Sequence, residues 1–256
     1  MFAAMPRPKP NSTPDDLAFG INACAMALEY GAARSLMFLR DTRNPRVLAL
    51  ADRARHAGLS VSEVDERRLD ELTASGVHQG VLVRLKQFAP VDIGAATRDL
   101  SRASLVVLLD SVTDPQNVGA VLRTAVAVGV QAIVLPLRRG ATLGPGVHRA
   151  SAGFSFIAPV AAPSNLAQAV RNLKDSGFWV VAASAGEGAQ SATAFDWPRR
   201  TALILGSEGE GVGRLLLDLS DFRVALPMDP RVESLNVGVA FGALAYLWKR
   251  QWGDAG

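Results

Sequence analysis

Three polar segments of this sequence each follow a short apolar stretch, and they contain the side chains best suited to chemistry. They occupy residues 110–123, 206–213 and 227–236. Their candidate reactive side chains are Asn117 and Arg123 in the first, Glu208 in the second, and Ser234 and Asn236 in the third. Amides, a guanidinium and a carboxylate together can orient a polar substrate, stabilise negative charge and accept a proton.

The second segment, GSEGEGVG, is rich in glycine, which lets a backbone approach a ligand closely. It is not a Walker A loop, because no lysine follows Gly211, and it does not match GxGxxG. Glu208 and Glu210 disfavour a polyphosphate and favour a cationic or hydroxyl-bearing ligand. On its own the segment is also compatible with an ordinary turn between a strand and a helix.

The third segment leads into an apolar stretch with helical periodicity. Taken alone, Ser234 is typical of a helix N-cap, with Glu233 near the positive end of the helix. The predicted helix over 235–250 carries several small residues: Gly238, Ala240, Gly242, Ala243 and Ala245. This pattern indicates close packing either within the chain or between two copies of it.

The elements that must position these side chains form an α/β domain over 104–256. Short apolar stretches at 105–110, 132–136, 179–184, 202–208 and 222–228 predict buried strands. Helical patterns at 118–129, 165–177 and 235–250 separate most of them. Strands and helices in alternation predict a parallel sheet covered on both faces. Ligands bind beyond the carboxyl ends of such strands, so we expect the three polar segments to meet in one crevice.

The N-terminal part predicts a smaller α/β domain over 17–88, after a disordered tail at 1–16. We expect helices over 16–31, 44–58 and 67–75, strands over 35–40 and 59–64, and a turn followed by a strand over 76–86. His78, in the turn GVHQG, either contacts RNA or shapes the turn, and His148 either faces RNA or lies in a solvated loop. Residues 89–103 are interpreted as a linker or a connecting helix.

The composition of the chain excludes several protein classes. Of 256 residues, 49% are hydrophobic and 20% charged, which is enough to form a real core. No uninterrupted apolar stretch reaches the roughly 18 residues of a membrane span, and the N-terminus lacks the pattern of a secretory signal. One cysteine, Cys24, excludes an internal disulfide, predicts a core position and favours a reducing, cytoplasmic location. With only three histidines besides, we expect no metal site.

The basic residues are 23 arginines and four lysines. Arginine suits bidentate contacts with phosphate and stacking on bases. A genome rich in G and C gives the same bias, so charge alone supports RNA binding only weakly.

The three polar segments together, DSVTDPQNVGAVLRTA, ALILGSEGEGV and VALPMDPRVESLNVGVA, resemble in order and spacing the motifs of the SpoU (TrmH-like) branch of the SPOUT RNA 2′-O-ribose methyltransferases. The resemblance extends over about 150 residues. The N-terminal part, with GVHQGVLV, resembles the substrate-binding domain of the rRNA-modifying members. Within this branch, the chain resembles the group that methylates a guanosine ribose in bacterial 23S rRNA.

This resemblance implies a fold, a cofactor and a reaction. The fold is a SPOUT domain with a deep trefoil knot, plus a ribosomal-protein-like N-terminal domain. The cofactor is S-adenosylmethionine, the reaction is methyl transfer to a ribose 2′-hydroxyl, and the enzyme is a homodimer. The implied catalytic residues are Asn117, Arg123, Glu208, Ser234 and Asn236. The implied cofactor-binding residues are Ala183, Ser184, Ala185, Gly206, Gly211, Leu226, Met228 and Leu235. Gly238 departs from the serine of several members.

Three alternatives remain at this stage. They are an enzyme of the same family that acts on tRNA, an antibiotic-resistance enzyme that acts on rRNA, and a relative that binds RNA without turnover. The complete set of motif residues argues against the last.

Overall fold

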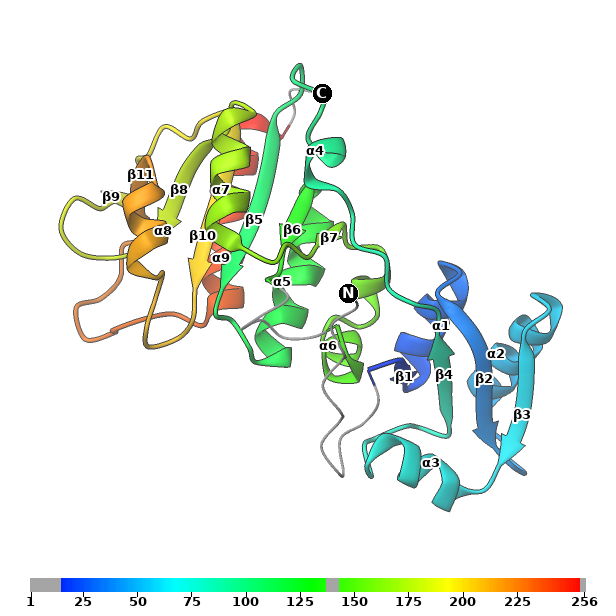
Figure 1. Ribbon diagram of the computed structural model, residues 1–256. Helices are drawn as coiled ribbons and strands as arrows, with labels where there is room; N and C mark the ends of the chain where they lie inside the picture. The colour runs from blue at the N-terminus through cyan, green and yellow to red at the C-terminus, as the bar shows by residue number, and fades with distance from the viewer. Residues whose placement is uncertain (1–14, 137–142, 254–256) are drawn as a thin grey trace. The chain divides into compact units, whose positions relative to one another are not determined.

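The computed structural model describes residues 15–136 and 143–253, which fall into two units (Figure 1). Unit 1 contains the described residues up to Phe88 together with Leu143–Phe156, and unit 2 contains the remainder. Nearly all of the predicted tail, residues 1–14, lies outside the described residues.

Unit 1 is a four-stranded sheet with helices on both faces. Its elements are β1 (Leu17–Phe19), α1 (Ile21–Glu29), β2 (Ala33–Leu39), α2 (Pro45–His56), β3 (Ser60–Val64), α3 (Glu66–Thr73), β4 (Val81–Leu85), α6 (Pro145–Ala150) and the 3₁₀ helix η1 (Phe154–Phe156). The strand order is β1-β4-β2-β3, in which only β2 and β3 run parallel. Apolar side chains of α1 and α2 form the larger core with one face of this sheet. Leu69 of α3 packs on the other face.

The helix predicted over 16–31 is wrong at its beginning. Leu17–Phe19 form strand β1, which pairs antiparallel with β4 and is buried. Gly20 then adopts φ +86°, a conformation that favours glycine, and α1 begins at Ile21. Strand pairing with a distant segment therefore overrides the helical spacing of the local apolar residues. The other predicted elements of this region are present, with ends shifted by a few residues.

Segment 143–156 belongs to the core of unit 1, although it lies in sequence between two strands of unit 2. Gly153, with φ +87°, packs so closely that an added Cβ would lie 2.5 Å from Cβ of Met26. The guanidinium of Arg149 lies 5.9 Å from the ring centroid of Phe19, and Phe156 packs against the larger core. The segment is thus an integral part of this unit.

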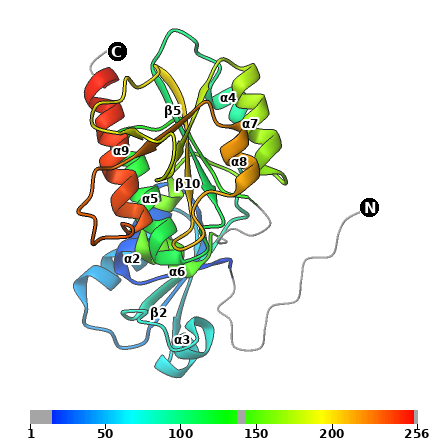
Figure 2. The same cartoon turned by 90° about the vertical axis from the view of Figure 1, so that its left-hand side faces the viewer.

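Unit 2 has a seven-stranded sheet between two layers of helices (Figure 2). Its elements are α4 (Ile93–Ala96), β5 (Ser104–Asp110), α5 (Pro115–Val128), β6 (Ala132–Val134), β7 (Val160–Ala161), α7 (Leu166–Asp175), β8 (Trp179–Ala183), β9 (Gln190–Ser191), β10 (Arg200–Gly206), α8 (Arg214–Leu219), β11 (Phe222–Ala225) and α9 (Val237–Trp252). The order is β7-β6-β5-β10-β8-β11-β9, and every pairing is parallel. Figure 2 shows α5 and α9 on one face and α7 and α8 on the other.

The predicted parallel sheet, its five apolar strands and the three helices between them are confirmed. The two-residue strands β7 and β9 and the six-residue helix α8 were not predicted, since elements this short carry little periodicity. Among the described residues, no helix is long and apolar enough to cross a membrane.

Residues 89–103 are held to unit 2 by an arginine. Arg200 donates to the backbone carbonyls of Asp99 and Thr97, each at 3.0 Å, and its guanidinium lies 4.3 Å from the ring centroid of Phe178. Partial burial lowers the pKa of Arg200. This segment therefore has a fixed path over the amino ends of the strands.

Candidate functional site

The first polar segment places Asn117 in the first turn of α5. Strand β5 ends at Asp110, and Ser111 turns the chain with φ +58°. Asp114 caps the helix by accepting a hydrogen bond from the Gln116 amide at 3.1 Å, with Pro115 at the first helical position. Asn117 follows directly. Arg123 lies six residues further along the same helix, with an exposed side chain.

The second segment folds back tightly onto the end of β10. An added Cβ on Gly206 would lie 1.9 Å from the carbonyl carbon of Gly211, so only glycine fits at position 206. Gly211 adopts φ +68°, and its amide donates to the Ser207 carbonyl at 2.9 Å. Glu208 lies inside this narrow loop with an exposed side chain.

The third segment ends at Asn236, which is the N-cap of α9. Its Oδ1 accepts hydrogen bonds from the amides of Gly238 at 2.9 Å and Val239 at 3.4 Å. The interpretation of Ser234 as the cap is therefore wrong. The cap lies two residues later, because the backbone becomes helical only at Val237.

The three segments meet through direct hydrogen bonds, as expected from the carboxyl ends of neighbouring parallel strands. Nδ2 of Asn236 donates to Oδ1 of Asn117 at 2.6 Å and to Oε1 of Glu208 at 3.0 Å. Nδ2 of Asn117 donates to the same Oε1 of Glu208 at 2.9 Å. Residues separated by 91 and 119 positions in the chain thus form one cluster, which we call the amide–carboxylate cluster.

Packing of α5 against α9 supports this cluster. An added Cβ on Gly238 would lie 2.9 Å from Cβ of Ala120, so the two helices approach closely near their N-termini. Gly238 is the position that departs from the serine of several family members. Here it allows the helix that begins at Asn236 to approach the helix that carries Asn117.

Among the described residues, Ser234 takes no part in the hydrogen bonds of the amide–carboxylate cluster. Ser234 is exposed and, within residues 15–136 and 143–253, makes no hydrogen bond to any of the three side chains. Arg123 projects from α5 about two turns from Asn117. The catalytic roles expected for both remain predictions.

The residues expected to bind the cofactor lie at the ends of three adjacent strands. Ala183 ends β8 and is followed by Ser184 and Ala185, Gly206 ends β10, and Leu226 follows β11. The register aligns these ends, since Ile204 pairs with Ala182 and Val224 pairs with Ala183. The ends therefore open onto the same edge of the sheet.

This edge fits a nucleoside cofactor with an apolar face. Met228 and Leu235 are each 37% exposed, and the Gly206–Gly211 contact leaves backbone rather than side chains at the end of β10. Apolar side chains and backbone amides or carbonyls are what a planar base and a ribose require. Within the described residues, no cluster of three or more histidine, cysteine or acidic side chains could hold a metal ion.

A salt-linked turn stiffens the segment that carries Met228. Arg231 donates from Nε and Nη2 to the two oxygens of Asp229, each at 2.9 Å. These hydrogen bonds lower the pKa of Asp229 to about 2, so its carboxylate is charged throughout the physiological range. The hydrogen bonds that hold this turn join Asp229 and Arg231 and do not involve Glu233.

The two histidines singled out in the sequence are structural. Nδ1 of His78 accepts a hydrogen bond from the Gly80 amide at 3.0 Å, and the neighbouring Gln79 accepts from the Ile21 amide at 2.9 Å. The motif GVHQG thus caps α1 and shapes the turn before β4. His148 is only 4% exposed, with Nδ1 2.8 Å from the Ser155 hydroxyl, and burial lowers its pKa to about 4. Both expectations for His148, a side chain that faces RNA and a solvated loop, are therefore wrong, because the side chain is buried in α6.

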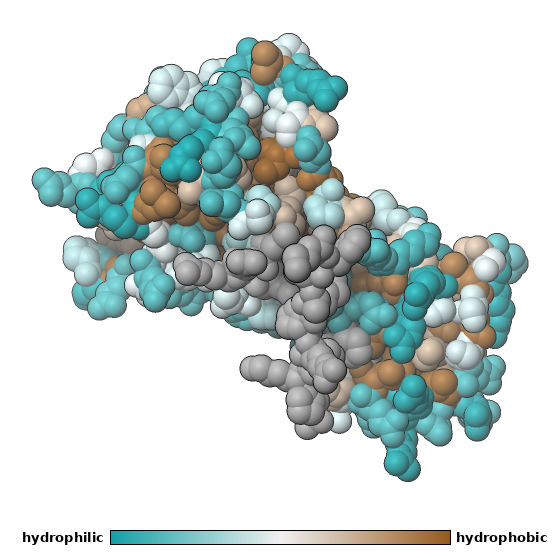
Figure 3. Space-filling view, in the orientation of Figure 1, coloured by the Kyte–Doolittle hydropathy of each residue, from teal (hydrophilic) through white to brown (hydrophobic). Residues whose placement is uncertain are grey.

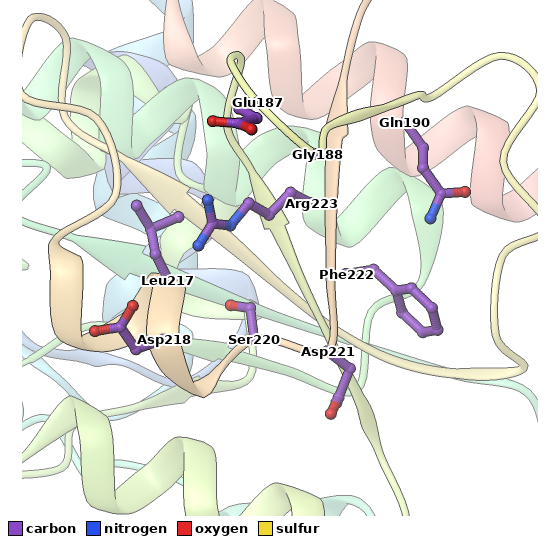
Figure 4. Close-up of a pocket in the computed structure, with 9 residues that line it drawn as sticks. All are labelled: Glu187, Gly188, Gln190, Leu217, Asp218, Ser220, Asp221, Phe222 and Arg223. Atoms are coloured by element: carbon purple, nitrogen blue, oxygen red, sulfur yellow. The ribbon is translucent and has the colours of Figure 1, made fainter.

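A separate cavity of about 420 Å³ lies between α8, β11 and the loop after β8 (Figure 4). Arg223 points into it below Glu187, as Figure 4 shows. Asp221 at its edge is paired with Lys174 at 2.6 Å. None of the predicted site residues lines this cavity, so it is distinct from the amide–carboxylate cluster.

Comparison with known proteins agrees with this geometry. The model of the SpoU rRNA Methylase family matches residues 104–246, and the model of RNA 2′-O ribose methyltransferase substrate binding matches residues 17–91. Two proteins named 23S rRNA (guanosine-2′-O-)-methyltransferase are similar along most of their length. That of Xanthomonas campestris pv. campestris is 36% identical over 91% of this chain and 95% of its own. That of Pseudomonas aeruginosa is 37% identical over the same shares.

A solved structure is similar as well. The AdoMet-bound rRNA methyltransferase of Sinorhizobium meliloti superposes with a TM-score of 0.74 at 25% identity, covering 91% of this chain and 86% of that one. The prediction of an S-adenosylmethionine-dependent RNA methyltransferase is confirmed by these matches. The first family model alone spans more than half of the chain, and the chain therefore belongs to the SpoU rRNA methylase family.

Proposed function

We propose that this protein transfers a methyl group from S-adenosylmethionine to the ribose 2′-hydroxyl of a guanosine in 23S rRNA. The observation that carries the proposal is the amide–carboxylate cluster of Asn117, Glu208 and Asn236 at the sheet edge that fits the cofactor. The guanosine and the 23S rRNA follow from the names of relatives that align with over nine-tenths of the chain.

The proposed reaction requires alignment of the hydroxyl and management of its proton. A ribose hydroxyl is a weak nucleophile at neutral pH, whereas S-adenosylmethionine, when bound, supplies an activated methyl group. The side chains must therefore hold the ribose in line, an effect worth about 7–11 kcal/mol in well-oriented reactions. Two rigid helix N-termini and a tight glycine loop are suitable supports for this task.

Glu208 is the proposed contact for the ribose. Its Oε1 already accepts hydrogen bonds from both asparagines, which fixes the carboxylate plane. Its Oε2 has no protein partner within the described residues and is left to accept the hydroxyl proton or a guanidinium. The two amides thus act as orienting groups for one carboxylate.

Arg123 is proposed to stabilise negative charge rather than to act as a base. A guanidinium keeps its proton in proteins, but its forked donors suit a developing alkoxide and the adjacent phosphate. Its exposure on α5 leaves it accessible to RNA. An Arg123→Lys variant with a new ionisation near the lysine pKa in its pH–rate profile would favour a base at this position instead.

Unit 1 offers a surface that suits the proposed RNA substrate. Arg40, Arg43 and Arg46 lie within seven residues at the carboxyl end of β2 and the N-terminus of α2, and all three are exposed. In the part of the chain that the structure describes, none of them forms an ion pair. Unpaired arginines next to a helix N-terminus favour contact with phosphate groups.

We further propose that the enzyme is a homodimer through α9. Val239 is 59% exposed and Tyr246 54% exposed, and the exposed Ala243 lies between them on the same face of the helix. Figure 3 draws the side of unit 2 that carries α7 and α8 in Figure 1, where hydrophilic side chains alternate with apolar areas. An apolar stripe on a helix beside the cluster supports self-association. Analytical sedimentation of the wild type and of Tyr246→Glu measures this self-association.

Two details of the fold and the location in the cell are also proposals. The hydrogen bond from Asn236 to Glu208, which places the chain before α9 against the loop after β10, supports a knotted C-terminal segment. The mixed four-stranded sheet of unit 1 supports a ribosomal-protein-like fold. A cytoplasmic location follows from the proposed substrate, ribosomal RNA.

The test is methyl transfer from labelled S-adenosylmethionine to deproteinised 23S rRNA and, separately, to tRNA. Wild type, Arg123→Ala and the control Arg171→Ala, an exposed arginine on α7, are compared. We expect label at one rRNA guanosine in alkaline-resistant dinucleotides, lost only in Arg123→Ala. Label in tRNA instead would favour a tRNA-directed enzyme. Cofactor binding without transfer to either RNA would indicate an assembling ribosomal particle as substrate.

A further inference from the structure

Asp110, the last residue of β5, is tied to a residue 103 positions away. Its Oδ2 accepts a hydrogen bond from the backbone amide of Gly213 at 2.8 Å. Its Oδ1 accepts one from the hydroxyl of Ser111 at 3.2 Å, and the left-handed backbone of Ser111 turns the chain away from the sheet. The carboxylate is thus held at the end of the strand rather than projecting into solvent.

This hydrogen bond closes the loop that carries Glu208. The loop leaves the sheet at Gly206, which is the residue paired with Asp110 in the parallel register of β5 and β10. It ends at Gly213, which the Asp110 carboxylate holds. Both ends of the loop are therefore fixed to the same residue, once by strand pairing and once by a side chain.

The carboxylate also replaces a missing helix cap. Gly213 is the N-cap of α8. Because glycine has no side chain, α8 has no side-chain hydrogen bond from its own N-cap residue. In a capping box, a carboxylate three residues later accepts the hydrogen bond from the N-cap amide. Here Asp110 accepts that bond from a neighbouring strand, and its negative charge lies near the positive end of the helix.

The fit at Gly213 is close. An added Cβ on this residue would lie 3.0 Å from Oδ2 of Asp110. The backbone there is extended, with φ −61°, so a side chain at this position would disturb the carboxylate and not the local backbone. Glycine at position 213 therefore matches the approach of Asp110.

We propose that Asp110 is a positioning residue for methyl transfer, which holds the loop 207–213 so that Glu208 meets both asparagines. It acts through the loop and does not contact the substrate. The proposal rests on the proposed function for its kinetic readout. Its structural readout, the hydrogen bonds of Asn117 and Asn236 to Glu208, does not depend on methyl transfer.

The experiment compares Asp110→Ala, Asp110→Asn and the matched control Asp221→Ala. Asp221 accepts a hydrogen bond from the Val180 amide at 2.8 Å and thus makes the same kind of bond at the opposite end of the strands. In Asp110→Ala we expect kcat to fall by about 10- to 100-fold, the effect of a catalytic group displaced by about 1 Å. Asp110→Asn keeps an acceptor oxygen and should recover kcat to within a few-fold of wild type.

The structural readout is the NMR signals of the Asn117 and Asn236 side-chain amides, with hydrogen exchange at the Gly213 amide. We expect Asp110→Ala to shift those signals and speed that exchange, and Asp221→Ala to do neither. If Asp110→Ala fails to fold, Gly213→Ala, which crowds the carboxylate, takes its place. Unchanged amide signals in a folded variant would overturn the proposal. Shifted signals in a protein that methylates no RNA would support the positioning role and overturn the proposed function alone.

Discussion

Substitution of Asn236 separates two roles that one side chain combines. Its Oδ1 caps α9, and its Nδ2 donates to Asn117 and Glu208. Asn236→Ala removes both the cap and the donor. Asn236→Asp keeps a capping oxygen, because aspartate is as good an N-cap as asparagine, but it replaces the donor by a second carboxylate facing Glu208.

The cost of Asn236→Ala follows from these contacts. Loss of the cap costs about 1 kcal/mol. Each of the two lost hydrogen bonds is worth about 0.5 kcal/mol, the lower end of the usual range, because both bonds are exposed to solvent. We therefore expect the free energy of unfolding to fall by about 2 kcal/mol, which lowers Tm by about 4–8 °C in a chain of this size.

Asn236→Asp should instead show a penalty that depends on pH. The new carboxylate would lie about as far from Glu208 Oε1 as Nδ2 does now, at 3.0 Å. Like charges at this distance raise the pKa of the pair, so the folded protein holds a proton that the unfolded chain releases near pH 4. A raised pKa in the folded state means that stability is lost as pH rises above about 4. We expect near wild-type stability at pH 4 and a lower Tm at pH 8.

Thermal unfolding at both pH values and methyl transfer at pH 8 form the assay, with Asn165 as the matched control. Asn165 caps α7 through a 3.0 Å hydrogen bond from Gln168 and lies outside the cluster. Asn165→Ala should cost about 1 kcal/mol without loss of activity, and Asn165→Asp should show no pH-dependent penalty. The reasoning is refuted if the two alanine variants lose equal stability and Asn236→Asp behaves as Asn165→Asp at both pH values.

Three further outcomes follow from the packing and charges. Gly153→Ala should destabilise the protein by about 1–3 kcal/mol in urea unfolding, since its Cβ would overlap Met26; Gly177→Ala, with a similar φ and open space around it, should lose less. Burial raises the pKa of the Cys24 thiol, so a thiol reagent should label it only at the rate of unfolding, and rapid labelling of the native protein would contradict the core position. The pKa of Asp229, about 2 in the wild type, should return toward 3.8 in Arg231→Ala when followed by carboxyl NMR, and no change would show that another group holds it low.

The sequence was sufficient for the sheet and for the meeting of the three polar segments, because apolar strands and the rule for strand ends are local signals. It did not reveal which atoms meet. The hydrogen bonds from Asn117 and Asn236 to one oxygen of Glu208 depend on where α5 and α9 begin, and Ser234 was the more obvious cap. The bond from Gly213 to Asp110 links residues with no shared pattern. Strand β1 was missed because its partner β4 lies more than sixty residues away.

The inclusion of 143–156 in unit 1 has a consequence for exchange of the substrate-binding part between relatives. A transplant of residues 17–88 alone would leave Met26 facing a foreign residue in place of Gly153, and Phe19 without Arg149. A working chimaera must take both pieces from one parent. The same constraint ties substitutions in residues 17–88 to a stretch of fourteen residues inside the methyltransferase sequence, so we expect the two segments to change together despite their separation.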